Sequence, residues 1–269
     1  MNHAGRFVTD TAVSAVASGR WSGTIDRGWW IQRGPNGGYL AAIVVRALQA
    51  EVGDRSRTPR SVTIHYLRPP VEGPVEIHTV VERAGRSLTT VSARMFQRGE
   101  VIAVAIAAFA AVRDDSVDFD DTIAPAVAAP DDCPPLDRPP FPLPMRDRYE
   151  CRLAVGGELF SEGPTALTGG WIRLADGEPA DLVVVAALTD AWPPAAFTRV
   201  ASPIVVPTID LSIHFRRSAV PDPAGWFLVV FRTTLSTDGY LEEDGEVWSE
   251  GGVLLAQSRQ LAVSVAVLP

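Results

Sequence analysis

One strand-like segment occurs twice in this sequence, and the repeat restricts how the chain can fold. Residues 61–68 read SVTIHYLR and residues 208–217 read TIDLSIHFRR, so that VTIHY aligns with LSIHF at an offset of 149 residues. The turns GEV at 99–101 and GGV at 251–253 align at an offset of 152 residues. A chain of 269 residues is long enough for two domains of ordinary size. The sequence therefore predicts two copies of one domain in tandem.

Each copy combines one apolar segment with several strand-like segments. YLAAIVVRAL at 39–48 and DLVVVAALTD at 181–190 are apolar on nearly every side, which predicts helices that are buried all round. Strand patterns follow at 61–68, 75–82, 87–97 and 100–112, and again at 208–217, 225–235, 240–249 and 252–267. This order predicts an α+β fold in which an antiparallel sheet wraps around a long buried helix in each copy.

An acidic and Pro-rich segment separates the two copies. Five aspartates lie between positions 114 and 121, and eight prolines lie between 125 and 144. Such a density of proline is incompatible with a helix or the interior of a sheet. We therefore expect an N-terminal domain at 1–113, a linker at 114–146 and a C-terminal domain at 147–269.

Composition restricts the partners of this protein. The net charge of -8 and the pI near 5.0 argue against a nucleic-acid partner, because binding a polyanion needs a basic surface. Cys133 and Cys151 are too few for a disulfide scaffold or a zinc knuckle, so we expect neither a metal nor another cofactor. The start MNHAGRFVTD lacks a signal-peptide pattern, and no run approaches the roughly 20 apolar residues of a membrane helix. We expect a cytoplasmic protein with no membrane span.

Positions at which the copies differ in polarity are candidates for a functional site. Burying a polar group costs free energy unless the group has a partner or a function. Aligning LAA at 40–42 with LVV at 182–184 places Asp190 opposite Leu48, and the offset of 152 places Gln260 opposite Ala108. Alternation along the last strand puts Gln260 in an inward-facing row. Both residues are therefore candidates for a buried polar site.

Thr208 is a third candidate, because it begins the repeated strand where the first copy has Pro59. Strand alternation places it on the face opposite the apolar row of Ile209, Leu211, Ile213 and Phe215. Thr208 reaches the inner side only if the chain enters the sheet irregularly after Pro207.

These segments resemble the TesB-type acyl-CoA thioesterases, a family with a double-hotdog fold. The resemblance rests on LTDAWPP, PTIDLSIHFRR and GGVLLAQSRQLAV in the second copy, and on GPNGGYLAA, HYLRPP and RSLTTVSARMFQRGEVIAVAIAAF in the first. It implies hydrolysis of fatty acyl-CoA to the free acid and coenzyme A, by a water that Asp190, Thr208 and Gln260 hold. It also implies a homodimer of double-hotdog chains or a higher homo-oligomer. The Pro-rich linker departs from the family pattern.

Thioester hydrolysis needs a proton acceptor for the water and hydrogen-bond donors for the developing oxyanion. Desolvation should raise the pKa of Asp190 and make it a better base near neutral pH. The N–H groups of Gly37 and Gly38 would bind the oxyanion if they begin the first helix. Candidate contacts to the phosphates of coenzyme A are Arg68, Arg216 and Arg217.

Other interpretations of these residues remain open. Asp190 could end a helix before Pro193 and Pro194, and Gln260 could bond a backbone group in the core. His65 and His214 occur in both copies, which favours a structural or interface role over catalysis. The alternative functions are a non-catalytic acyl-thioester-binding hotdog protein and an enoyl-CoA hydratase-like enzyme. The latter needs an Asp and a His, and neither apolar segment contains a histidine.

Overall fold

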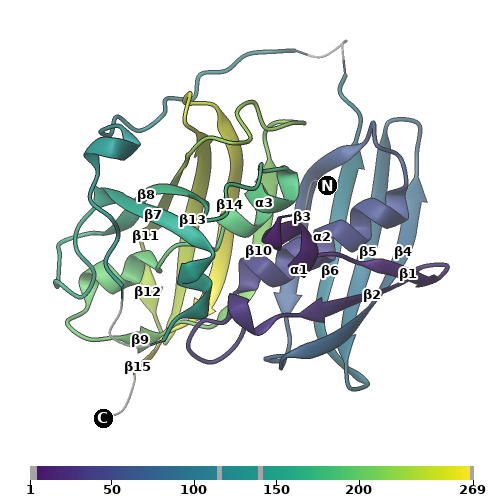
Figure 1. Cartoon of the computed structure of the whole chain (residues 1–269), viewed down its shortest axis with the longest axis horizontal. Coiled ribbons are helices and arrows are strands. Elements are labelled where there is room, and N and C mark those ends of the chain that lie inside the picture. Colours follow the sequence, from purple (N-terminus) through teal and green to yellow (C-terminus); the bar gives the residue numbers. More distant parts are fainter. Residues whose placement is uncertain (1–4, 114–116, 139–141, 267–269) are drawn as a thin grey trace.

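Two similar halves lie side by side in the computed structural model, which describes residues 5–113, 117–138 and 142–266 (Figure 1). The first half contains α1 (Arg6–Asp10), β1 (Ser14–Ala17), β2 (Arg20–Ile25), η1 (Arg27–Trp29), α2 (Gly37–Val52), β3 (Thr58–Tyr66), β4 (Gly73–Ala84), β5 (Leu88–Gln97) and β6 (Glu100–Ala110). The second half contains η2 (Pro130–Asp132), η3 (Pro144–Asp147), β7 (Tyr149–Gly156), β8 (Ala166–Leu174), α3 (Leu182–Leu188), η4 (Ala195–Arg199), β9 (Ile204–Val205), β10 (Thr208–Phe215), β11 (Phe227–Thr233), β12 (Ser236–Thr237), β13 (Tyr240–Ser249), β14 (Leu254–Val263) and β15 (Val265–Ala266).

The two halves share one antiparallel sheet, which is joined at β3 and β10. Its order among the described residues is β1-β2-β4-β5-β6-β3 from the first half, followed by β10-β14-β13-β11-β8-β7 from the second. At the junction Thr63 lies opposite Ser212, its own counterpart in the repeat, and the two hydroxyls are 2.9 Å apart. The second half therefore repeats the first about an approximate twofold axis at this pair. His65 and His214 are exposed strand residues at the same junction.

The two central helices differ in length. Most of the 16 residues of α2 are buried, and the Asn36 side chain caps the helix by accepting a hydrogen bond from Tyr39 N at 2.9 Å. All seven residues of α3 are buried, and Asp181 caps its start. The prediction of a long buried helix is therefore right for the first half and wrong for the second. Pro193 and Pro194 follow α3 closely and cannot continue a helix.

The structure corrects two alignments between the copies. Gln260 pairs with Leu211, and the corresponding pair in the first half is Ala107 with Val62. The counterpart of Gln260 is thus Ala107, at an offset of 153 residues, because the turn between β13 and β14 is one residue longer than its equivalent. When the helices are aligned by their N-caps, Asn36 and Asp181, the counterpart of Asp190 is Val45 instead of Leu48.

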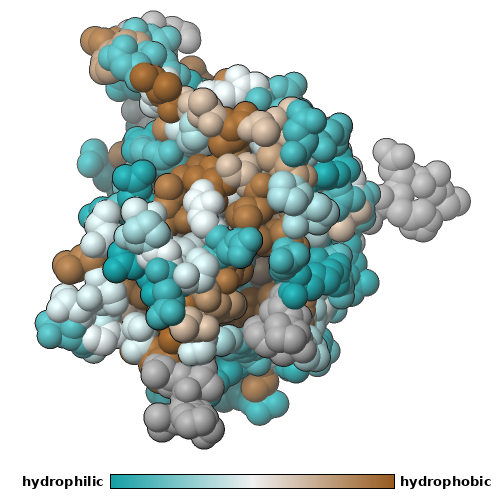
Figure 2. Space-filling model, turned by 90° about the vertical axis from the view of Figure 1, so that its left-hand side faces the viewer, coloured by the Kyte–Doolittle hydropathy of each residue, from teal (hydrophilic) through white to brown (hydrophobic). Residues whose placement is uncertain are grey.

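Residues 133–136 of the expected linker pack on the second half. Leu136 N donates to Cys151 O and Leu153 N donates to Pro134 O, both at 2.9 Å, so this segment runs along β7. Cys133 joins an apolar cluster on the outer face of the sheet, formed with Trp171, Trp226, Leu228, Trp248 and Leu254. Figure 2 views the molecule from this side and shows hydrophobic side chains gathered in the middle of the face. Positions 114–116 and 139–141 of the expected linker lie outside the described residues.

No helix in the described part of the chain is long and apolar enough to cross a membrane.

Candidate active site

The site lies where the start of α2 meets the end of α3. Asp190 follows α3 by two residues, and its Oδ2 accepts hydrogen bonds from Gly38 N and Asn36 Nδ2, each at 2.9 Å. Asn36 Nδ2 also donates to the Asp190 backbone carbonyl at 2.6 Å. A helix start favours a negative charge because its first N–H groups and its dipole point toward the anion. The first half therefore binds the carboxylate that the second half supplies.

Glycine permits this close approach of the two helices. A Cβ on Gly38 would lie 2.3 Å from the backbone oxygen of Ala187, and a Cβ on Gly37 would lie 2.9 Å from Asp190 Oδ2. The Tyr66 hydroxyl donates to Gly37 O at 2.8 Å and holds the first turn of α2 from the side of β3. Gly37 and Gly38 do begin α2, as the oxyanion prediction required. In this structure, however, their N–H groups are directed to the Asp190 carboxylate.

Burial raises the pKa of Asp190 to about 6. Hydrogen bonds from Gly38, Gln260, Gly37 and Asn36 act in the opposite direction, because they stabilise the charged form. The carboxylate is therefore mostly ionised at neutral pH, yet it is a stronger base than an exposed aspartate. This pKa suits a group that must accept a proton from water.

Gln260 and Thr208 lie together next to Asp190. Gln260 is only 6% exposed, and its Oε1 accepts from the Thr208 hydroxyl at 2.8 Å. Thr208 reaches this inner side because the pairing of β10 with β14 shifts register between Thr208 and Asp210. This bulge is the irregular entry that the strand pattern required. The three residues predicted from the repeat and the family resemblance thus come together.

Glu243 is a fourth polar residue of this cluster, and the sequence reasoning missed it. Its side chain accepts from Gln260 Nε2 at 2.9 Å and from Ala195 N at 2.5 Å, and the residue is 3% exposed. Burial, followed by the nearby charge of Asp190, raises its pKa to about 8, against hydrogen bonds that lower it. The offset of 152 places Glu243 opposite Val91, a fully buried residue of β5. The same repeat comparison could have identified it, but the acidic run EED at 242–244 looks like an exposed strand face.

The described histidines lie away from this cluster. His65 and His214 are exposed on the junction strands, and His78 lies beside Glu76 on β4. The Asp and His pair that a hydratase-like enzyme needs is therefore not formed around Asp190 by the described residues. No cluster of His, Cys, Asp and Glu side chains in the described part of the chain could hold a metal ion.

Comparison with known proteins decides the family. A family model described as the acyl-CoA thioesterase C-terminal domain matches residues 130–264, and a model for the N-terminal domain of the same family matches residues 26–110. The chain belongs to the acyl-CoA thioesterase family. None of the curated proteins compared with it is similar in sequence.

Solved structures agree with this family and its hotdog fold. A hot dog fold protein of unknown function from Alicyclobacillus acidocaldarius is 30% identical, with a TM-score of 0.89 over 99% of this chain and 100% of that one. A candidate thioesterase II from Thermobifida fusca YX is 28% identical, with a TM-score of 0.84 over 97% and 98% of the two chains. The acyl-CoA thioesterase II TesB2 from Mycobacterium marinum is 20% identical, with a TM-score of 0.78 over 97% and 98%, and supports the fold alone.

The three arginines considered for coenzyme A do not lie together in this chain. Because β3 and β10 are antiparallel, Arg68 follows β3 at the end of the sheet where Thr208 begins β10. Arg216 and Arg217 follow β10 at the opposite end. Arg68 pairs with Glu100 at 3.0 Å, Arg216 donates to Gln257 at 2.9 Å, and Arg217 pairs with Asp120. Only Arg68 therefore lies at the site's end of the sheet.

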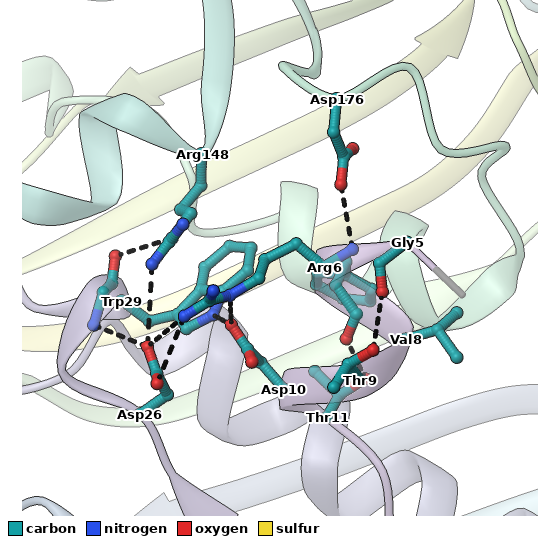
Figure 3. Close-up of polar contacts among 12 residues, drawn as sticks. Gly5, Arg6, Val8, Thr9, Asp10, Thr11, Asp26, Trp29, Arg148 and Asp176 are labelled. Atoms are coloured by element: carbon teal, nitrogen blue, oxygen red, sulfur yellow. Dashed lines mark hydrogen bonds and ion pairs between the residues drawn. The ribbon is translucent and has the colours of Figure 1, made fainter. Parts of the chain in front are cut away.

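A polar network around α1 and η1 joins the first half to the second (Figure 3). Trp29 stacks on Tyr39 at 5.0 Å between ring centroids, and its Nε1 donates to Asp10 at 2.9 Å. Arg148 from the second half donates to Gly28 O at 3.2 Å. Arg6 N in turn donates to Asp176 of the second half at 2.9 Å. Contacts from both halves thus hold the segment that leads to Gly37 and Gly38.

Proposed function

We propose that this protein hydrolyses the thioester of fatty acyl-CoA to the free acid and coenzyme A, with water as the nucleophile. The observation that carries the proposal is the buried cluster of Asp190, Gln260 and Thr208 at the start of α2. Membership of the acyl-CoA thioesterase family supports the same reaction.

In the proposed mechanism Asp190 takes a proton from the water. Its Oδ2 already accepts from Asn36 and Gly38, so Oδ1 is the oxygen that we assign to the water. Gln260 and Thr208 hold the water in the direction of attack. The water oxygen bonds to the carbonyl carbon, the bond from carbon to sulfur breaks, and the proton on Asp190 passes to the leaving thiolate.

The oxyanion donors that we propose remain the N–H groups of Gly37 and Gly38. In this structure the N–H of Gly38 donates to the Asp190 carboxylate at 2.9 Å, and the N–H of Gly37 also lowers the pKa of that carboxyl. When Asp190 becomes protonated, it accepts hydrogen bonds from these donors less strongly. At the same time, negative charge appears on the thioester oxygen. The helix start would then stabilise the charge at its new position.

A panel of acyl-CoA substrates of increasing chain length tests the proposal. Release of free thiol is followed with a thiol reagent, and hydration of an enoyl-CoA is measured in parallel with the same preparation. We expect thiol release without hydration, and a chain-length optimum that identifies the substrate. Binding of acyl-CoA without thiol release would indicate a binding protein, and water addition to the enoyl-CoA would indicate a hydratase.

The domain division at 1–113, 114–146 and 147–269 and the pairing of chains are further proposals. Limited proteolysis should cut within 114–146 and leave two resistant fragments, which remain associated through the continuous sheet. Light scattering should give twice the chain mass of 28.9 kDa or a higher multiple. A monomer at all concentrations would contradict the proposed assembly.

A further inference from the structure

Two buried carboxyl groups flank the amide of Gln260, and the proposed reaction uses only one of them. The Gln260 side chain lowers the pKa of Asp190, and Glu243 accepts from Gln260 Nε2 at 2.9 Å. Gln260 and Glu243 are direct neighbours across the β13–β14 pair. Glu243 is therefore in contact with the proposed water-binding residue without facing the proposed base directly.

Glu243 favours one of the two orientations of the Gln260 side-chain amide. A side-chain amide has a donor end and an acceptor end. The contact with Glu243 holds the donor end, Nε2, at 2.9 Å, and in this orientation Oε1 accepts from the Thr208 hydroxyl. An apolar residue at position 243 would leave both orientations of the amide open.

Glu243 also connects Gln260 to the segment that carries Asp190. Its second oxygen accepts from the N–H of Ala195, which begins η4 five residues after Asp190. One carboxylate thus holds both the amide on β14 and the backbone between Asp190 and η4. Burying an acid costs free energy, and the first half has the apolar Val91 at the same position. The fold itself therefore does not require an acid here.

We propose that Glu243 is a positioning residue, which fixes the orientation of the Gln260 amide and its distance from Asp190. The inference rests on the proposed hydrolysis and adds a fourth residue to its machinery. A purely structural role, in which Glu243 only caps the start of η4 through Ala195, is the competing explanation.

The variants Glu243→Gln and Glu243→Val test this role. Glutamine preserves the volume but can accept from only one of the two donors, Gln260 Nε2 and Ala195 N. Valine is the residue of the first half. We expect kcat to fall about 10- to 100-fold in both variants, with KM changed less than about twofold, because orientation of the water and not substrate binding is lost.

The matched control is Asp244→Asn, the adjacent acid of β13, which pairs with Arg259 on the exposed side of the sheet. We expect its kcat and KM to equal those of the wild type. Circular dichroism and melting temperature, measured for every variant, identify any loss of fold.

A double-mutant cycle separates positioning from structure. If Glu243 acts through Gln260, the double variant Glu243→Gln with Gln260→Ala should be no slower than Gln260→Ala alone. A structural role predicts that the two losses multiply, and this result would overturn the inference, as would wild-type kcat in both Glu243 variants. Absence of thiol release by the wild type itself would instead refute the proposed function, so the two failures are distinguishable.

Discussion

Asp190 and Gly38 are 152 positions apart, yet the carboxylate of the first accepts a hydrogen bond from the backbone N–H of the second at 2.9 Å. The two residues belong to different halves of the chain. The proposed catalytic base is therefore positioned by the half that does not contain it, and neither half alone could form this site. The two halves therefore have different parts in this site: the first supplies the start of α2, and the second supplies Asp190.

Asp190→Asn should lower kcat about 10²- to 10⁴-fold, the contribution of a positioned general base. An asparagine carbonyl can still accept from Gly38 and Asn36, so the melting temperature should change little. Steady-state thiol release and thermal unfolding, compared with Asp244→Asn, provide the measurement. Wild-type turnover in Asp190→Asn would remove the residue from the mechanism.

Between pH 5 and 7 activity should rise with pH through an ionisation near 6. Burial raises the pKa of Asp190 to about 6, and only the ionised form can take a proton from water. kcat/KM should therefore be low at pH 5, increase tenfold per pH unit well below the pKa, and level off above pH 7. A profile that is flat between pH 5 and 7 would be inconsistent with this base.

Gly38→Ala should destabilise the protein and abolish activity. The new Cβ would lie 2.3 Å from the Ala187 carbonyl oxygen, so α2 and α3 must move apart. Such overpacking costs about 1–3 kcal/mol. Gly34→Ala is the control, because no atom lies within 4 Å of its Cβ position. Equal melting temperatures for the two variants would show that the helices tolerate the extra atom.

Thr208→Val should lower kcat, whereas Thr208→Ser should retain most of it. Valine has the shape of threonine but cannot donate to Gln260 Oε1, and a neutral hydrogen bond contributes about 1 kcal/mol, or roughly fivefold in rate. Serine keeps the hydroxyl. The comparison of kcat between the two variants tests the hydroxyl itself, and equal rates would exclude a role for it.

Arg68→Ala should raise KM for acyl-CoA, and Arg216→Ala should not. Arg68 lies at the end of the sheet where Thr208 begins β10, whereas Arg216 lies at the other end. The matched substrate is an acyl-pantetheine thioester, which lacks the nucleotide phosphates and should be hydrolysed equally by both variants. A raised KM for the Arg216 variant alone would reverse this assignment.

Particular residues show where inference from the sequence succeeded. Gln260 was identified by comparison of the copies, although the alignment was wrong by one residue, because the alternation within the last strand already pointed it inward. Thr208 had the wrong parity for a regular strand, and a bulge, which no periodicity in the sequence indicates, turned it to the inner face. Glu243 was hidden by its charged neighbours, since a run of acids is usually solvent-exposed.

The sequence by itself determined the duplication, the two apolar segments that form α2 and α3, the succession of strands along the chain, and Asp190 and Gln260 as candidates for a buried polar site. These properties follow from local periodicity and from comparison of one half with the other, whereas Thr208 depended on the family resemblance. Only the tertiary structure decided what those residues contact. The antiparallel junction of β3 and β10 separated Arg68 from Arg216 and Arg217, and the approach of α2 to α3 directed the N–H groups of Gly37 and Gly38 to Asp190. Such contacts join residues that are far apart in the chain, and their partners are set by packing between the halves.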